Sequence, residues 1–244
     1  MRYLLGYLIS PKKFYSLSLK LTPWLLLVFT VFFSYGLLGG LIWTPADYLQ
    51  GDGFRILYVH APCAFLSIFI YTIMASAAFV ALTWRIKLAF LVIRQSAAIG
   101  MLFTSLALIT GSIWGKPMWG TWWIWDARLT SELILLFLYL GIILFQSSVA
   151  HKRTGEQTVA ILTLVGFIDV PIIHYSVNWW NTLHQGPTLN FFTHSTIDSS
   201  MLYPLLSMIL AFISYYGFIL LLRMQYELID SELIRPFDGV NKNK

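Results

Sequence analysis

The sequence is poor in charged residues. Asp, Glu, Lys and Arg make up 11% of its 244 residues, whereas hydrophobic residues make up 58%. A soluble domain carries about 25% charged residues, so this chain has too few charges to cover a soluble globule. Its net charge of +5 would suggest nucleic acid if the Lys and Arg residues formed a patch, but they lie at the ends of apolar runs. We therefore expect a membrane protein with several spans and no nucleic-acid partner.

Cysteine is almost absent as well. Cys63 is the only one, which excludes an intrachain disulfide and a thiolate metal cluster. No Ala-x-Ala site follows a short apolar core near the start of the chain, so the first apolar run is expected to stay as a span. The chain also lacks a Gly-rich phosphate loop ending in Lys-Ser or Lys-Thr, and nothing in it predicts ATP hydrolysis.

Long apolar runs are abundant instead. A spanning helix needs about 20 mostly apolar residues. Because open sheet edges cannot lie in lipid, we expect an all-α integral membrane protein. It would consist of a six-span domain at 1–222 and a polar cytoplasmic tail at 223–244. Six windows fit the length of a span: 22–43, 56–84, 88–113, 129–150, 157–177 and 201–222.

The basic residues are distributed unevenly between the two sides of the predicted bundle. Thirteen of the sixteen Lys and Arg residues lie near the chain ends or in the turns after the second and fourth windows. The positive-inside rule places this side, with both termini, in the cytoplasm. The three longer loops, at 44–55, 114–128 and 178–200, are then expected to face outward.

Tryptophan is concentrated in the second of these loops. An aromatic belt explains one or two tryptophans per helix end, but not five in one short segment beside Asp126 and Arg128. Indole rings stack well on planar ligands, and Arg128, Arg55 or Lys116 could pair with acidic groups. We therefore expect a platform for a large, planar, acidic molecule. Its predicted residues are Trp114, Trp119, Trp122, Trp123, Trp125, Asp126, Arg128 and Arg55.

Two histidines flank this segment on the outer side. His60 lies near the start of the second span, and His184 follows a Trp-Trp-Asn run in the third outer loop. A lone interfacial histidine is more often structural, but neutral imidazole is the usual axial ligand of heme iron. Two imidazoles from separate segments could approach an iron from opposite faces. His174 and His194 are reserve candidates.

Acidic residues within the spans are rare. Asp169 falls near the middle of the fifth window, just before Pro171. Such a group is either functional or bonded to a neighbouring helix, aided by the backbone carbonyl that proline frees. Arg128 and Glu132 are four residues apart, which predicts an ion pair on one helix face.

The run from Trp119 to Thr130 reads Trp-Gly-Thr-Trp-Trp-Ile-Trp-Asp-Ala-Arg-Leu-Thr. It resembles the Trp-Trp-Asp motif of heme-handling membrane proteins. Chain length, six spans and flanking histidines are similar to those of the heme exporter protein C (CcmC) family of cytochrome c maturation, and the resemblance covers essentially the whole chain. It implies that His60 and His184 are the axial ligands of heme b, and that residues 114–128 form the heme platform.

The resemblance also implies a place and partners. The place is the bacterial inner membrane, with the functional loops in the periplasm. The first partner is a periplasmic heme chaperone, to which the chain would deliver heme. An associated ABC transporter would supply an ATP-binding subunit, a second membrane subunit and a small single-span subunit, so we expect no enzyme activity of this chain itself. The larger relatives carry a further histidine pair inside the membrane, and no such pair is evident here.

Two other functions are compatible with the sequence. A small-molecule transporter could use Asp169 in its pathway, but the chain shows no inverted repeat and no matching pair of broken spans. A b-type electron-transfer subunit would need histidine pairs deep within the spans, whereas His60 and His184 are peripheral.

Overall fold

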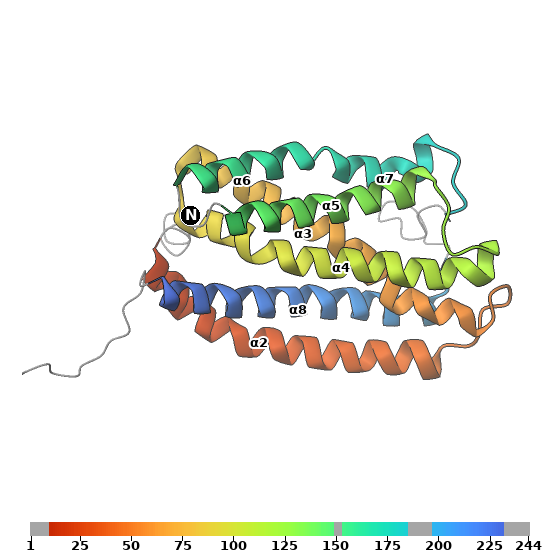
Figure 1. Cartoon of the computed structure of the whole chain (residues 1–244). Coiled ribbons are helices and arrows are strands. Elements are labelled where there is room, and N and C mark those ends of the chain that lie inside the picture. Colours follow the sequence, from red (N-terminus) through yellow and green to blue (C-terminus); the bar gives the residue numbers. More distant parts are fainter. Residues whose placement is uncertain (1–9, 149–152, 185–196, 232–244) are drawn as a thin grey trace, which may run out of the picture.

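The computed structural model describes residues 10–148, 153–184 and 197–231. These residues are helical apart from short connections, and within them only an isolated bridge, Asp47 with Gly51, has strand character. Figure 1 shows the elements in order. They are α2 (Pro11–Leu38) continued by a π-helical turn (Gly39–Trp43), a 3₁₀ turn (Asp52–Ile56) leading into α3 (Leu57–Trp84), α4 (Lys87–Trp119), α5 (Ala127–Ser148), α6 (Arg153–Gly166), α7 (Asp169–Trp179) and α8 (Ser199–Asp230).

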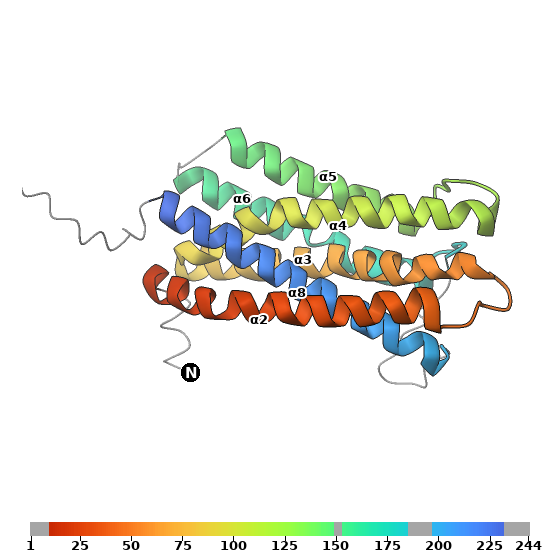
Figure 2. The same cartoon turned by 90° about the horizontal axis from the view of Figure 1, so that it is seen from below.

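Six segments of the described chain are long and apolar enough to cross a membrane, and α6 and α7 together form the fifth of them. The predicted all-α fold with six spans is thereby confirmed. The helices run along one common direction: α3 packs along α4, and α2 packs along α8 on one side of that pair (Figures 1 and 2). α5 and the α6–α7 pair cover the other side.

Large apolar side chains fill the centre of the bundle. Leu66, Ile70 and Met74 of α3 are completely buried, as is Leu135 of α5. Tight helix contacts depend on glycine, since a β-carbon on Gly100 would lie 2.2 Å from the ring of Tyr139. This close packing fixes α3, α4 and α5 against one another, and these are the helices that carry most of the site described below.

One boundary differs from the prediction. The segment 114–128 was expected to be a loop, but α4 continues to Trp119 and only 120–126 lie between helices. The prediction was wrong because hydropathy ends a span at the first polar residues, whereas the backbone stays helical through Pro117. The helix stops at Gly120, whose φ of +78° suits glycine, and whose N–H donates to the carbonyl of Lys116 at 3.0 Å.

The fifth span is interrupted near its middle. Pro171 has no N–H to donate to the carbonyl four residues earlier, that of Phe167. This carbonyl instead accepts a bond from Val170 at 3.1 Å, and regular helix is absent at 167–168. The interruption separates α6 from α7, and Asp169 is the first residue of α7.

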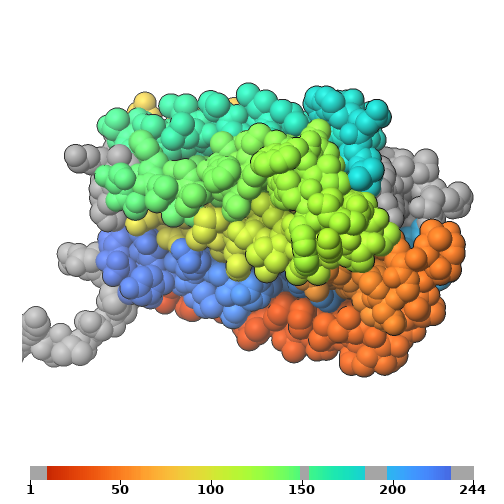
Figure 3. All heavy atoms as spheres, turned by 45° about the vertical axis from the view of Figure 1, so that its right-hand side comes forward, coloured from red at the N-terminus to blue at the C-terminus, as the bar shows by residue number. Residues whose placement is uncertain are grey.

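The bundle has two distinct ends. The connections 44–51, 120–126 and 180–184 gather at one end, which we call the tryptophan-rich end (Figure 3). The start of α2, the turn between α3 and α4, the start of α6 and the end of α8 lie at the opposite end (Figure 1).

Candidate functional site

A cavity of about 300 Å³ opens at the tryptophan-rich end. Its wall combines helices α3, α4, α5 and α7 with the segment after α7. Five of the ten ligand and platform residues predicted from sequence meet here although they are far apart in the chain. Among the lining residues are His60, Trp114, Trp119, Arg128, His174 and His184.

His60 is held from behind by α4. Its Nδ1 lies 3.1 Å from the carbonyl oxygen of Ala107 and 3.1 Å from the Thr110 hydroxyl. That hydroxyl already donates to Leu106, so both partners act as acceptors and the proton is assigned to Nδ1. Nε2 then keeps its lone pair and has no hydrogen bond among the described residues. A histidine oriented through Nδ1 with a free Nε2 is the usual arrangement of a metal ligand.

Two residues of α4 shape the surroundings of the His60 ring. A β-carbon on Gly111 would lie 2.9 Å from Cε1 of His60, so glycine leaves the space that the imidazole uses. The ring of Trp114 meets the imidazole edge-on, with centroids 5.7 Å apart. Trp114 is itself fixed, because its Nε1 donates to Oε1 of Gln50 at 3.0 Å.

His184 belongs to the segment after α7 and is held less directly. Its backbone N–H donates to the Thr182 hydroxyl at 3.1 Å, and its ring lies 5.1 Å from that of Trp119. Nδ1 is 3.8 Å from Oδ2 of Asp126, too far for a hydrogen bond, and is buried with no such partner among the described residues.

Electrostatics keep the His184 imidazole neutral. Burial lowers the pKa of His184 to about 4, and the positive charge of Arg128 acts in the same direction. Asp126 opposes this shift through its negative charge. Because this pKa lies below neutral pH, the ring is uncharged there, and the uncharged ring is the form that can donate a lone pair to a metal.

Asp126 connects the tryptophan segment to the histidine segment. Its Oδ1 accepts the backbone N–H of Leu129 at 2.8 Å in the first turn of α5, and its Oδ2 accepts the hydroxyl of Thr182. The side chain of Asp126 is only 6% exposed. The carboxylate thus orients the segment that carries His184.

Arg128 lines the cavity and forms no ion pair among the described residues. Nη1 of Arg128 donates to the carbonyl oxygen of Ile173 on α7 at 3.1 Å. The predicted ion pair with Glu132 is wrong, since no such pair is present within the described residues. Glu132 points into the bundle, where its Oε1 is buried without a hydrogen bond. Arg128 therefore remains available for an acidic ligand.

The other predicted platform residues lie outside this cavity. Trp122 and Trp125 are exposed, and Trp123 packs edge-on against Trp125 with centroids 5.4 Å apart. Arg55 points elsewhere: it donates to the carbonyl of Gly40 at 2.7 Å and pairs with Asp52 at 2.9 Å. The structure thus divides the expected platform into a cavity wall, made by Trp114 and Trp119, and an exposed loop.

The reserve candidates occupy different places. His174 on α7 lines the cavity and packs edge-on against Tyr175 at 4.8 Å. Asp169 is buried deeper in the bundle, with Oδ2 lacking a hydrogen bond among the described residues. His194 lies outside the described residues.

Sequence reasoning missed several supporting residues. Ala107, Thr110, Gly111 and Met118 share one helix face with the predicted Trp114, at three- and four-residue spacing, so the face of α4 behind the site could have been found from periodicity. Nothing in the sequence indicated that the Gln50 side chain bonds to Trp114.

Comparison with known proteins decides the family. The model of the family described as heme exporter protein C matches residues 4–236. The chain belongs to the heme exporter protein C family. It is 47% identical to "Heme exporter protein C" of Haemophilus influenzae, over 93% of each chain. Its identity to the Escherichia coli K12 protein of that name is 45%, over 93% of this chain and 91% of the relative. Membership in the heme exporter protein C family confirms the resemblance inferred from the tryptophan-rich motif.

A plant relative carries a mitochondrial name. A protein of Arabidopsis thaliana named "Putative cytochrome c biosynthesis ccmC-like mitochondrial protein" is 41% identical over 83% of this chain and 74% of its own length. Heme exporter protein C relatives thus share most of their length with this chain, including the region that builds the cavity.

Proposed function

We propose that this chain binds heme b in the cavity at the tryptophan-rich end and hands it on during cytochrome c biogenesis. Its relatives are named as heme exporters and cytochrome c biosynthesis proteins, which supports a role as a heme-handling membrane component and not as an enzyme. The observation that carries the proposal is the pair of imidazoles, His60 and His184, that line one cavity from two separate segments.

The donor set fits heme. Nε2 of His60 has no hydrogen bond within the part of the chain that the structure describes, and the His184 ring is neutral, so each could bind iron. Trp114 and Trp119 offer flat apolar surface for the porphyrin. Arg128 is the cation inside the cavity that can pair with a propionate. Arg55 is already paired with Asp52. It would therefore affect heme only indirectly, by holding the connection that leads into α3.

The cavity faces the periplasm in this proposal. Arg85, Lys87 and Arg94 lie at the opposite end of the bundle, and the positive-inside rule places that end in the cytoplasm of a bacterial inner membrane. A heme entering the cavity would then be presented to a periplasmic heme chaperone. The exposed indoles of Trp122, Trp125 and Trp180 lie in the connections at this end and would give that chaperone an aromatic surface to contact.

Transfer requires the axial bonds to be displaceable once the chaperone docks. A vinyl edge left uncovered by the indole rings would be the part of the porphyrin that the chaperone's histidine reaches. The ATP-binding, second membrane and single-span subunits of the associated ABC transporter would supply the energy for release, and they would contact this chain along its apolar helix faces.

The test is the heme absorption of purified protein. His60→Gly and His184→Gly should each lose most of the Soret absorbance per protein, because each removes one axial bond. Added imidazole should restore the band, since it can enter the space left by the side chain. Full Soret absorbance in both variants without imidazole would overturn the proposal.

A further inference from the structure

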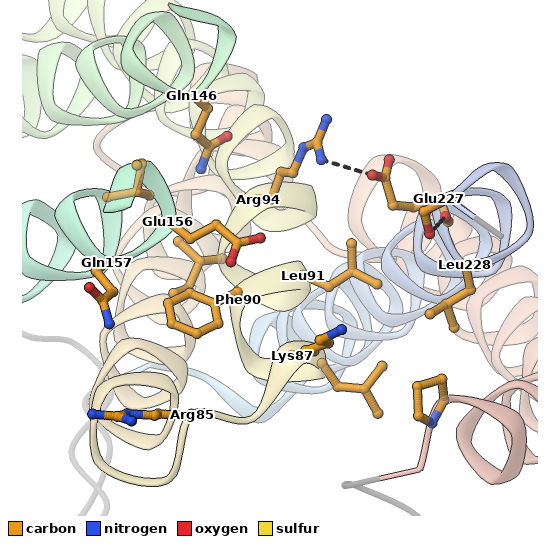
Figure 4. Close-up of a pocket in the computed structure, with 16 residues that line it drawn as sticks. Arg85, Lys87, Phe90, Leu91, Arg94, Gln146, Glu156, Gln157, Glu227 and Leu228 are labelled. Atoms are coloured by element: carbon orange, nitrogen blue, oxygen red, sulfur yellow. Dashed lines mark hydrogen bonds and ion pairs between the residues drawn. The ribbon is translucent and has the colours of Figure 1, made fainter. Parts of the chain in front are cut away.

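A second and larger cavity lies at the opposite end of the bundle. Its volume is about 610 Å³, which is within the range of small-molecule sites. The turn between α3 and α4, the first turns of α4 and α6, and the last turns of α5 and α8 surround it (Figure 4). It is far from the tryptophan-rich end and has no part in the heme site.

The lining has an apolar floor and a charged rim. Leu88, Leu91 and Leu228 are buried apolar side chains that close the bottom. Arg85, Lys87 and Glu156 are exposed at the rim, and they come from three different elements. An apolar floor below charged groups, where spanning helices end, matches the division between the acyl chains and the headgroup of a phospholipid.

Two of the charged side chains that line this cavity form an ion pair with each other. Nη1 of Arg94 pairs with Oε1 of Glu227 at 2.8 Å, and Glu227 also accepts a bond from Gln95 at 3.3 Å. Arg85, Lys87 and Glu156 have no ion pair with the side chains described in residues 10–148, 154–184 and 197–231. The rim therefore offers two cations and one carboxylate to a ligand.

Arg85 occupies a position that usually belongs to glycine. It ends α3 with φ of +54°, the one positive φ of a non-glycine residue in the described chain. A β-carbon in this conformation costs energy, and glycine is the common choice at such helix ends. The structure thus keeps a cationic side chain at the rim despite a less favourable backbone.

We propose that this cavity binds the headgroup of a zwitterionic aminophospholipid, of the phosphatidylethanolamine class. Arg85 and Lys87 contact its phosphate diester, Glu156 accepts from its primary ammonium, and the first carbons of its chains lie against the leucine floor. Phosphatidylglycerol would leave Glu156 facing an uncharged hydroxyl. Phosphatidylcholine has no N–H to donate to that carboxylate.

The experiment measures retained lipid by native mass spectrometry, with the full chain transferred from nanodiscs of phosphatidylethanolamine, phosphatidylglycerol or phosphatidylcholine. The unsubstituted protein should retain phosphatidylethanolamine best. In Glu156→Gln the preference for phosphatidylethanolamine over the other two lipids should fall by about two- to fivefold, which is the size of one exposed ion pair. Retention of phosphatidylglycerol should not fall in this variant. Removing both cations with Arg85→Gln and Lys87→Gln should lower retention of both lipids by about tenfold.

Two further variants keep the test decisive. Lys20→Gln removes an exposed cation of α2 that does not line the cavity, and retention should not change. Arg85→Gly relieves the backbone, so thermal stability without lipid should hold or rise while phosphatidylethanolamine retention falls. Equal retention of the three lipids by the unsubstituted protein, or unchanged retention when both cations are removed, would overturn the proposal.

Discussion

The two histidines of the site are supported in opposite ways. His60 stands on a helix, and α4 fixes its Nδ1 through a carbonyl and a hydroxyl. His184 stands on a connecting segment, and its Nδ1 has no hydrogen bond among the described residues. The difference teaches that the ring of one proposed ligand is held by hydrogen bonds, whereas the ring of the other is held by packing and charge. Heme release is then expected to begin at the His184 side.

The largest effect should come from crowding the fixed histidine. In Gly111→Leu the new side chain must occupy the space of the His60 ring, since even a β-carbon would lie 2.9 Å from Cε1. We expect at least about a tenfold loss of heme affinity, comparable to the loss of a metal ligand's supporting contact. Heme titration followed by Soret absorbance measures this.

Gly141→Leu is the matched control for that substitution. Gly141 lies on α5, and nothing approaches its β-carbon position within 4 Å. Heme affinity should be unchanged in this variant. An equal loss in both variants would mean that general helix disturbance, and not the position of His60, is responsible.

A second prediction concerns His184 and pH. Asp126 raises the pKa of His184 against the effect of burial. In Asp126→Asn this contribution is lost, so the pKa falls below about 4 and protonation competes with iron only at lower pH. The midpoint of acid-induced loss of the bis-imidazole spectrum should therefore move to lower pH. A midpoint that moves upward would contradict the assignment of His184 as the acid-sensitive ligand.

Asparagine is chosen for Asp126 because it still caps a helix. The Leu129 N–H keeps an acceptor, so the stability of α5 should change little. Asp126→Ala would remove the cap as well, at about 1 kcal/mol, and circular dichroism melting separates the two contributions.

A smaller effect is expected from loosening the fixed histidine. Thr110→Val removes one of the two acceptors of His60 Nδ1 and leaves the carbonyl of Ala107. A neutral hydrogen bond contributes about 0.5–1.5 kcal/mol, which corresponds to a severalfold loss of heme affinity. Thr104→Val is the control on the same helix, since its hydroxyl bonds only to the carbonyl of Gly100.

The smallest effect on heme should follow Asp169→Asn. Asp169 does not line the heme cavity, so Soret absorbance per protein should stay the same. Burying an amide costs less than burying an unpartnered carboxylate, so the thermal midpoint should hold or rise by a few degrees. Loss of heme in this variant would place Asp169 in the heme pathway and favour the transporter alternative.

The fold followed from the sequence where hydropathy was decisive. Six apolar windows gave six spans, and the histidines and two of the tryptophans expected to act together share one cavity. Helix ends were less predictable, since Trp114 and Trp119 lie in a polar extension of α4 that no hydropathy window contains.

Side-chain partners were the least predictable part. The spacing of Arg128 and Glu132 indicated an ion pair, but the carbonyl of Ile173 on α7 is the better placed acceptor. The position of the Arg55 side chain could not be predicted either. Its acceptor is the carbonyl of Gly40, which belongs to the π-helical turn at the end of α2. Both outcomes depend on tertiary contacts that local spacing does not contain.

The interruption before Asp169 divides the fifth span into two rods, α6 and α7, joined by residues 167–168, which are not in regular helix. In α7, the carbonyl of Ile173 accepts a hydrogen bond from the Arg128 guanidinium, and the helix leads directly into the segment that carries His184. A neighbouring subunit that tilts α7 alone would change the distance between the two imidazoles without unwinding α6. The proline break thus gives contacts made within the lipid layer a direct mechanical route to the two imidazoles that we propose as iron ligands.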